Sequence, residues 1–167
     1  MTKPIHPFRL RQRSAPAGDA LVSNRVLALA TLLRRSANLL YRRELGLSEV
    51  EWRILAMLGD QAPLTLGALV EILGLDKGQL SRNVTGLVKR RVLTRIPGPQ
   101  DSRDVRIALT ARGEETFEAL MRLALERNRE LTAGLSRAEI AMLRAVLDRL
   151  LANARTMLAQ SPTHRAP

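Results

Sequence analysis

Cysteine is absent from this sequence of 167 residues, and the only two histidines, His6 and His164, lie near its ends. Without cysteine the chain can form no disulfide framework, zinc ribbon or thiol redox switch. Histidines confined to the tails argue against a Cys/His metal site or a Ser-His-Asp triad within the fold. No glycine-rich phosphate-binding loop is present. We therefore predict no catalytic residues, no metal site and no cofactor, and hence a protein that is not an enzyme.

Long apolar runs are also missing. None approaches the roughly 18 residues that a transmembrane helix needs. Residues 1–13 are basic but lack the apolar core of a secretory signal. We expect a cytoplasmic protein without a membrane partner, built either as one domain of ordinary size or as a compact domain with terminal arms.

Aromatic residues are scarce, at 2% of the chain, whereas the net charge is +11. A large positive excess indicates an acidic polyanion as partner, although a compositional bias towards arginine is the alternative explanation. Proteins that bind RNA or single strands generally need aromatic side chains on which bases stack. Because this chain offers few, duplex DNA is the better fit.

The charge is concentrated in the middle of the sequence. Residues 76–113 contain nine Lys or Arg and three Asp, which gives +6. The segments on either side, 48–75 and 114–135, are both net acidic. A diffuse bias would not alternate in this way, so the basic block indicates a localised binding surface.

Apolar spacing and helix-start signals define the expected elements. Capping boxes begin at Ser48, Asp76 and Ser136, and Thr110 is a fourth N-cap. We predict helices over 19–45, 49–58, 66–73, 76–90 and 136–158, and one that runs from the cap at Thr110 to Gly134; the other stops are Gly46, Gly59 and Gly74. Strands 92–96 and 104–109 form a hairpin. The predicted fold is mainly α with a small β-hairpin wing.

A short helix, a tight turn, a polar-faced helix and a basic hairpin together indicate a winged helix-turn-helix. The second of these helices would enter the major groove and the hairpin the neighbouring minor groove. The exposed face of this second helix carries side chains that pair with base edges and phosphates, namely Lys77, Gln79, Ser81, Arg82, Asn83 and Thr85. Lys89, Arg90 and Arg95 are predicted phosphate neighbours. For Gln79, Ser81, Arg82 and Asn83 the alternative is a solvated helix face without a DNA contact.

Residues in and around this predicted winged helix-turn-helix resemble those of a known family. The residues concerned are Leu75-Asp76-Lys77, Arg82, Leu87-Val88-Lys89-Arg90, Arg95, Pro97, Asp101-Ser102-Arg103, Ile107-Ala108-Leu109-Thr110 and Gly113, together with Glu51-Trp52-Arg53-Ile54-Leu55. They are similar to those of the MarR-type transcriptional regulators, over about residues 21–158. The resemblance implies a homodimer that binds a near-palindromic operator and usually represses. It also implies that Asp101 braces the wing and that Arg103 is the minor-groove finger.

The resemblance further implies release from DNA by a small, often aromatic or phenolic, effector in a crevice beside the dimer helices. Arg35, Asn38 and Tyr41 are candidates for this crevice, although interface or surface positions explain them more simply. Trp52 is a core residue or a pocket wall. Asn128, on an apolar stripe, is a candidate buried polar residue of the dimer interface or pocket.

One residue departs from the family pattern. Arg91 stands where the family usually has a glycine after the recognition helix. A non-glycine residue in left-handed conformation costs roughly 1 kcal/mol. We therefore expect either a different helix end or a changed wing angle.

The expected organisation has five parts. Residues 1–18 form a flexible arm, 19–47 a first dimerisation helix and 48–113 the DNA-binding lobe; residues 114–160 form two further dimerisation helices and 161–167 a tail. The apolar stripes of the long helices need a cover, for which a second copy is the economical choice. Together with the family resemblance, these features predict a sequence-specific, duplex-DNA-binding regulator of transcription, a repressor that a small ligand releases from its operator. The alternative is a DNA-binding or architectural protein with the same winged fold and no effector.

Overall fold

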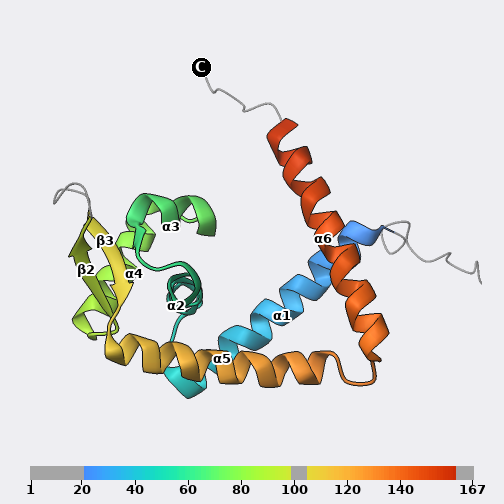
Figure 1. The fold of residues 1–167 in the computed structure, drawn as a ribbon, viewed down its shortest axis with the longest axis horizontal. Helices are drawn as coiled ribbons and strands as arrows, with labels where there is room; N and C mark the ends of the chain where they lie inside the picture. Colours follow the sequence, from blue (N-terminus) through green and yellow to red (C-terminus); the bar gives the residue numbers. More distant parts are fainter. Residues whose placement is uncertain (1–20, 99–104, 161–167) are drawn as a thin grey trace, which may run out of the picture. The chain divides into compact units, whose positions relative to one another are not determined.

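A computed structural model describes residues 21–98 and 105–160 (Figure 1). The elements are α1 (Val22–Leu45), α2 (Glu49–Gln61), β1 (Leu64–Thr65), α3 (Leu66–Leu73), α4 (Lys77–Lys89), β2 (Leu93–Pro97), β3 (Val105–Leu109), α5 (Ala111–Leu131) and α6 (Arg137–Gln160). The expected fold class, mainly helical with a small antiparallel sheet, is confirmed. The chain forms two compact units, and the boundary between them along the sequence falls within α5, between Leu120 and Met121.

The predicted helix starts are formed largely as expected. Ser48 and Glu51 make both bonds of a capping box, and so do Ser136 and Glu139. Asp76 begins α4 by accepting the Gln79 N–H at 2.8 Å, which is the first half of the predicted box. These bonds satisfy backbone N–H groups that a helix cannot pair internally.

The predicted end of α2 at Gly59 is wrong, because the helix continues to Gln61. A Cβ atom at Gly59 would lie 2.3 Å from the ring of Phe117, so this glycine makes room for the aromatic side chain of α5. The helix ends before Pro63, whose ring disfavours helical geometry at Ala62. Glycine at position 59 thus serves packing between two helices and not helix termination.

The sheet has the strand order β1-β3-β2 and is antiparallel throughout. Leu93 pairs with Leu109 at the open end of the β2–β3 hairpin, and Pro97 pairs with Val105 at the end next to residues 98–104. Strand β1, which pairs with β3 through Leu64 and Thr65, was not predicted. Two residues are too few to show a strand period.

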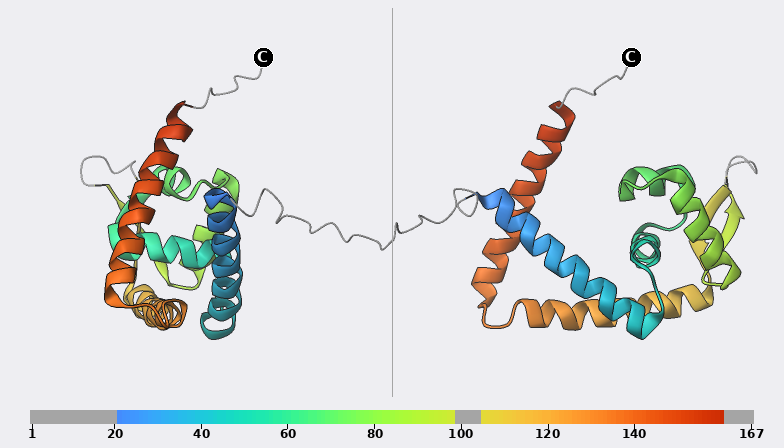
Figure 2. Two further views of the ribbon diagram at one scale, coloured as in Figure 1. Left: turned by 90° about the vertical axis from the view of Figure 1, so that its right-hand side faces the viewer. Right: turned by 180° about the vertical axis from the view of Figure 1, so that it is seen from behind.

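The core of the first unit lies between α2, α3, α4 and the sheet. These elements contact one another directly, and Figures 1 and 2 show α4 alongside the hairpin. The fully buried side chains are Leu47, Ile54, Leu55, Leu58, Leu69, Leu80, Val84, Leu87 and Leu93. The helix-turn-helix and its wing therefore share one apolar core.

The long helices are far less covered. Helix α1 buries only Ala37 and Tyr41, and α6 buries none of its 24 residues. The exposed large apolar residues of α6 are Met142, Leu143, Val146, Leu147, Leu151, Met157 and Leu158. Within the part of the chain that is described, none of the helices has the length and apolarity that crossing a membrane requires.

Candidate DNA-binding site

Helix α4 is held by one face and open on the other. Leu80, Val84 and Leu87 are buried and anchor it to the lobe. All six side chains predicted to contact DNA reach the surface of this helix: Lys77, Gln79 and Arg82 are exposed, and Ser81, Asn83 and Thr85 are partly exposed. The anchoring side chains thus leave a polar surface facing outward.

The polar side chains of α4 differ in how much of their bonding capacity the protein already uses. Asn83 donates its amide N–H to the Gln79 carbonyl at 2.9 Å, within the same helix. Among the described residues, Arg82 and Lys77 make no hydrogen bond or ion pair. Their charges remain available to an anionic partner such as a DNA phosphate.

The three predicted phosphate neighbours are not equivalent. Arg90 forms an ion pair with Glu51 at 3.0 Å, and the other carboxylate oxygen of Glu51 caps α2. Lys89 is exposed and adjoins Arg90 at the end of α4. Both precede the end of the hairpin where Leu93 pairs with Leu109. The other end, where Pro97 pairs with Val105, lies about 14 Å further along the strands.

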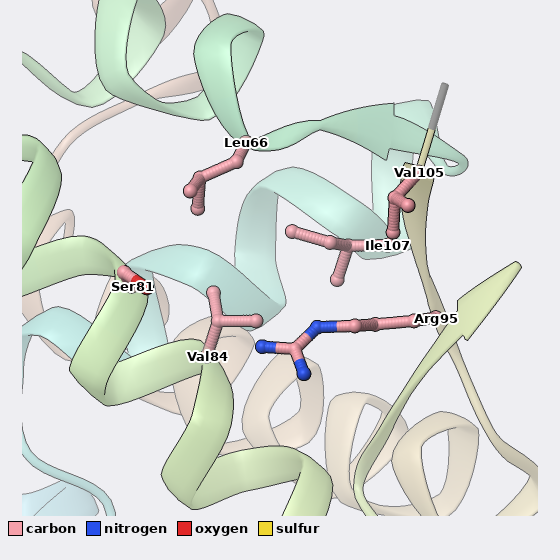
Figure 3. Close-up of a pocket in the computed structure, with 6 residues that line it drawn as sticks. All are labelled: Leu66, Ser81, Val84, Arg95, Val105 and Ile107. Carbon is pink, nitrogen blue, oxygen red and sulfur yellow. The ribbon is translucent and has the colours of Figure 1, made fainter. Parts of the chain in front are cut away.

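Arg95 lies elsewhere, on strand β2. Its Nη2 donates to Thr85 Oγ1 of α4 at 3.0 Å. The side chain extends over a hollow of about 140 Å³ that opens between α4, the start of α3 and the hairpin (Figure 3). The hollow is lined by Leu66, Ser81, Val84, Arg95, Val105 and Ile107. Sequence reasoning missed this hollow, because it is formed by elements that are distant in the chain.

Arg91 adopts a left-handed conformation, with φ 59°, unlike any other non-glycine residue in the described ranges. Its N–H bonds to the Val88 carbonyl at 2.9 Å, and the Val92 N–H bonds to the Leu87 carbonyl at 3.0 Å. This pair of bonds is a Schellman motif, the ordinary glycine-type helix end. Of the two alternatives expected for Arg91, a different helix end is therefore wrong, since arginine occupies the usual geometry; a changed wing angle stays a prediction.

A single hydroxyl joins the end of α4 to the start of α5. Thr110 Oγ1 donates to the Arg91 carbonyl at 2.6 Å and lies 3.2 Å from that of Val92. The same oxygen accepts the Gly113 N–H at 3.0 Å, which confirms the prediction that Thr110 is the N-cap of α5. The wing base is thus fixed at the point where both helices meet it.

The predicted wing residues Asp101 and Arg103 lie outside the described residues. Their roles as brace and minor-groove finger remain predictions. The strands that lead to and from them, β2 and β3, are in the predicted place.

The candidate ligand residues of α1 and α2 form a bonded cluster. Asn38 donates to Glu49 at 2.6 Å and accepts the Trp52 indole N–H at 2.9 Å. The rings of Tyr41 and Trp52 pack edge to face, with centroids 5.4 Å apart. Because these groups bond to one another, the cluster ties α1 to α2, a role that the sequence reasoning missed for Glu49.

Two further ligand candidates do not join this cluster. Arg35 is exposed on α1, and Asn128 is exposed in the second unit. The expected burial of Asn128 is therefore not found in the single chain.

Comparison with known proteins gives consistent results. The family model described as "MarR family" matches residues 45–104. The multiple antibiotic resistance protein MarR of Escherichia coli is 30% identical over 112 residues, which cover 66% of this chain and 78% of that protein. The chain belongs to the MarR family.

Solved structures of this family share the fold. A MarR/EmrR family regulator from Acinetobacter sp. ADP1 is 28% identical, with a TM-score of 0.69, and the match covers 80% of this chain and 94% of that one. A mutant MarR from E. coli, complexed with operator DNA, is 25% identical with a TM-score of 0.66, covering 83% and 99%. The chain is thus a DNA-binding transcriptional regulator of the MarR family and not an enzyme, as predicted.

Proposed function

We propose that this MarR-family regulator is a homodimeric repressor that binds a near-palindromic operator through α4 and the wing. The observation that carries the proposal is the outward polar surface of α4, where Arg82 and Lys77 have no partner within the described residues. Side chains of this kind recognise base edges and phosphates of duplex DNA. The operator complex of a related MarR supports the same use of the fold here.

The homodimer is supported by the uncovered helices. Apolar residues along α6, among them Leu143, Leu147 and Leu151, are exposed in the single chain. Contiguous apolar surface of this kind is seldom left in water. We assign its cover to a second copy, since a twofold axis would set two recognition helices about one DNA turn, roughly 34 Å, apart. We propose the same five-part organisation that the sequence predicts, with dimerisation helices in residues 19–47 and 114–160.

The effector is proposed to be a small aromatic or phenolic anion. The hollow beside Arg95 supports this class, because its lining is mostly apolar and the bond to Thr85 leaves other N–H donors of the guanidinium for a negative charge. Effector binding would shift the dimer between DNA-competent and DNA-incompetent populations without any covalent chemistry.

A gel-shift assay with the promoter region next to its own gene tests the DNA-binding mode. We expect a specific band at a salt concentration that removes non-specific binding. Arg103→Ala should weaken it and lower the salt slope by roughly one unit per protomer, while leaving self-association intact. If affinity and slope both stay unchanged, Arg103 is not a wing contact; if the wild type gives no specific band, the proposal fails.

A thermal-shift screen with aromatic acids tests the effector. A ligand that binds only the folded protein raises the unfolding midpoint by mass action. We expect at least one such acid to raise the midpoint and to weaken the gel-shift band. Complete insensitivity would favour the alternative, a DNA-binding or architectural protein without an effector.

A further inference from the structure

Arg95 has a place in the fold that differs from that of an ordinary surface cation. Its side chain leaves β2 and runs over Val84 and Ile107, which are both almost fully buried (Figure 3). At its far end the guanidinium donates to the hydroxyl of Thr85 on α4. The apolar part of the side chain therefore covers core residues, while the charged end bonds to a second element.

Arg82 provides the natural comparison. It lies on the same helix as Thr85, is exposed, and makes no hydrogen bond or ion pair among the residues described. A guanidinium in that state can reach a phosphate without breaking any bond. Arg95 differs, because its bond to Thr85 already uses one of its five N–H donors and holds the guanidinium against α4.

We infer that Arg95 is a positioning residue, which fixes the wing strand relative to α4 through its bond to Thr85. The inference rests on the proposed function and changes the role predicted for Arg95 from phosphate contact to internal tie. A helix and a wing that enter two grooves bind together only when their offset matches the DNA. A bond that sets this offset in the free protein lowers the ordering cost of binding.

The test is a double-mutant cycle with Thr85→Val and Arg95→Gln, measured as operator affinity over a range of salt concentrations. We expect each single variant to lose roughly fivefold in affinity, the size of one ordinary hydrogen bond. The double variant should lose no more than either single one, and Thr85→Ser, which keeps the hydroxyl, should retain affinity. All of these variants should keep the wild-type salt slope.

Arg82→Gln is the matched control, since it also replaces an exposed arginine by glutamine. It should lower the salt slope by about one unit per protomer, which shows that the assay detects the loss of a phosphate contact. In the free protein, amide hydrogen exchange of β2 should rise to the same extent in Thr85→Val and Arg95→Gln.

Two results would overturn the inference. One is a lower salt slope in Arg95→Gln, which would make Arg95 a phosphate contact. The other is a pair of losses that add in the double variant, which would make the two side chains independent. A wild-type protein that fails to bind DNA contradicts the proposed function instead, while the hydrogen exchange of the free protein still tests the tie itself.

Discussion

The DNA-binding lobe and helix α6 place their apolar residues in opposite environments. Between Leu47 and Leu93 the lobe buries nine side chains almost completely, whereas α6 buries none. Both begin with the same Ser-x-x-Glu capping box, so local signals do not separate them. The difference shows that the lobe has its own core, while α6 is a helix whose apolar face needs a partner.

The largest expected effect tests the core side of this comparison. Leu80 is fully buried at the base of α4, so Leu80→Ala should lower the free energy of unfolding by about 2–5 kcal/mol. Urea denaturation would measure the loss, which should not depend on protein concentration. A loss below about 1 kcal/mol would mean that the lobe is not packed as described.

The matched substitution in α6 is Leu147→Ala, since Leu147 is 37% exposed in the single chain. If a second copy covers it, truncation should weaken self-association by about 1.5–3 kcal/mol. Sedimentation equilibrium measures this, and Asp148→Ala on the same helix is the control. An unchanged association constant would remove Leu147 from the interface and weaken the contrast between the two regions.

Two helical glycines show where close packing of the lobe ends. Gly59→Ala would place a Cβ atom 2.3 Å from the Phe117 ring and should cost about 1–3 kcal/mol through overpacking. Gly86→Ala meets no atom within 4 Å and should stabilise α4 by up to about 1 kcal/mol. Thermal unfolding of both variants checks these opposite signs. Destabilisation of both would show that α4 is packed on all sides.

The smallest expected effect concerns the two capping boxes. Ser48→Ala should cost about 1 kcal/mol, and Ser136→Ala less, because the box at α6 is exposed. Hydrogen bonds from the Ser136 side chain and backbone lower the pKa of Glu139. Its stabilising contribution is therefore present above the ordinary carboxyl pKa and is lost as the pH falls through the lowered one.

An NMR titration of the Glu139 carboxyl carbon measures this directly. The midpoint in the wild type should lie below the midpoint in Ser136→Ala. Equal midpoints would show that the box does not hold in solution. Equal losses of stability at Ser48 and Ser136 would contradict the contrast between an integrated cap and an isolated one.

The sequence predicted a helix or strand wherever nearby residues determine where that element begins and ends. Capping residues and apolar spacing located α3, α4 and both hairpin strands to within one or two residues. Gly59 misled the prediction, because glycine ends a helix in one context and admits a neighbouring ring in another. Its partner Phe117 is far away in the sequence, so no local pattern distinguishes the two.

The site was predictable as a surface but not as a set of bonds. The polar residues of α4 reach the surface as expected, since the positions of Leu80, Val84 and Leu87 dictate which side is buried. The partners of Arg90 and Arg95 were not predicted. Both pair with residues of other elements, and net charge says nothing about which cations the fold already uses.

The hydroxyl of Thr110 limits which residues can replace threonine at this position. Aspartate is usually as good an N-cap as threonine. Here the capping oxygen also donates a proton to the Arg91 carbonyl and lies close to that of Val92. A carboxylate has no proton to donate and would face two carbonyl oxygens with its negative charge. Serine is therefore the conservative replacement, and the usual equivalence of capping residues fails at this junction.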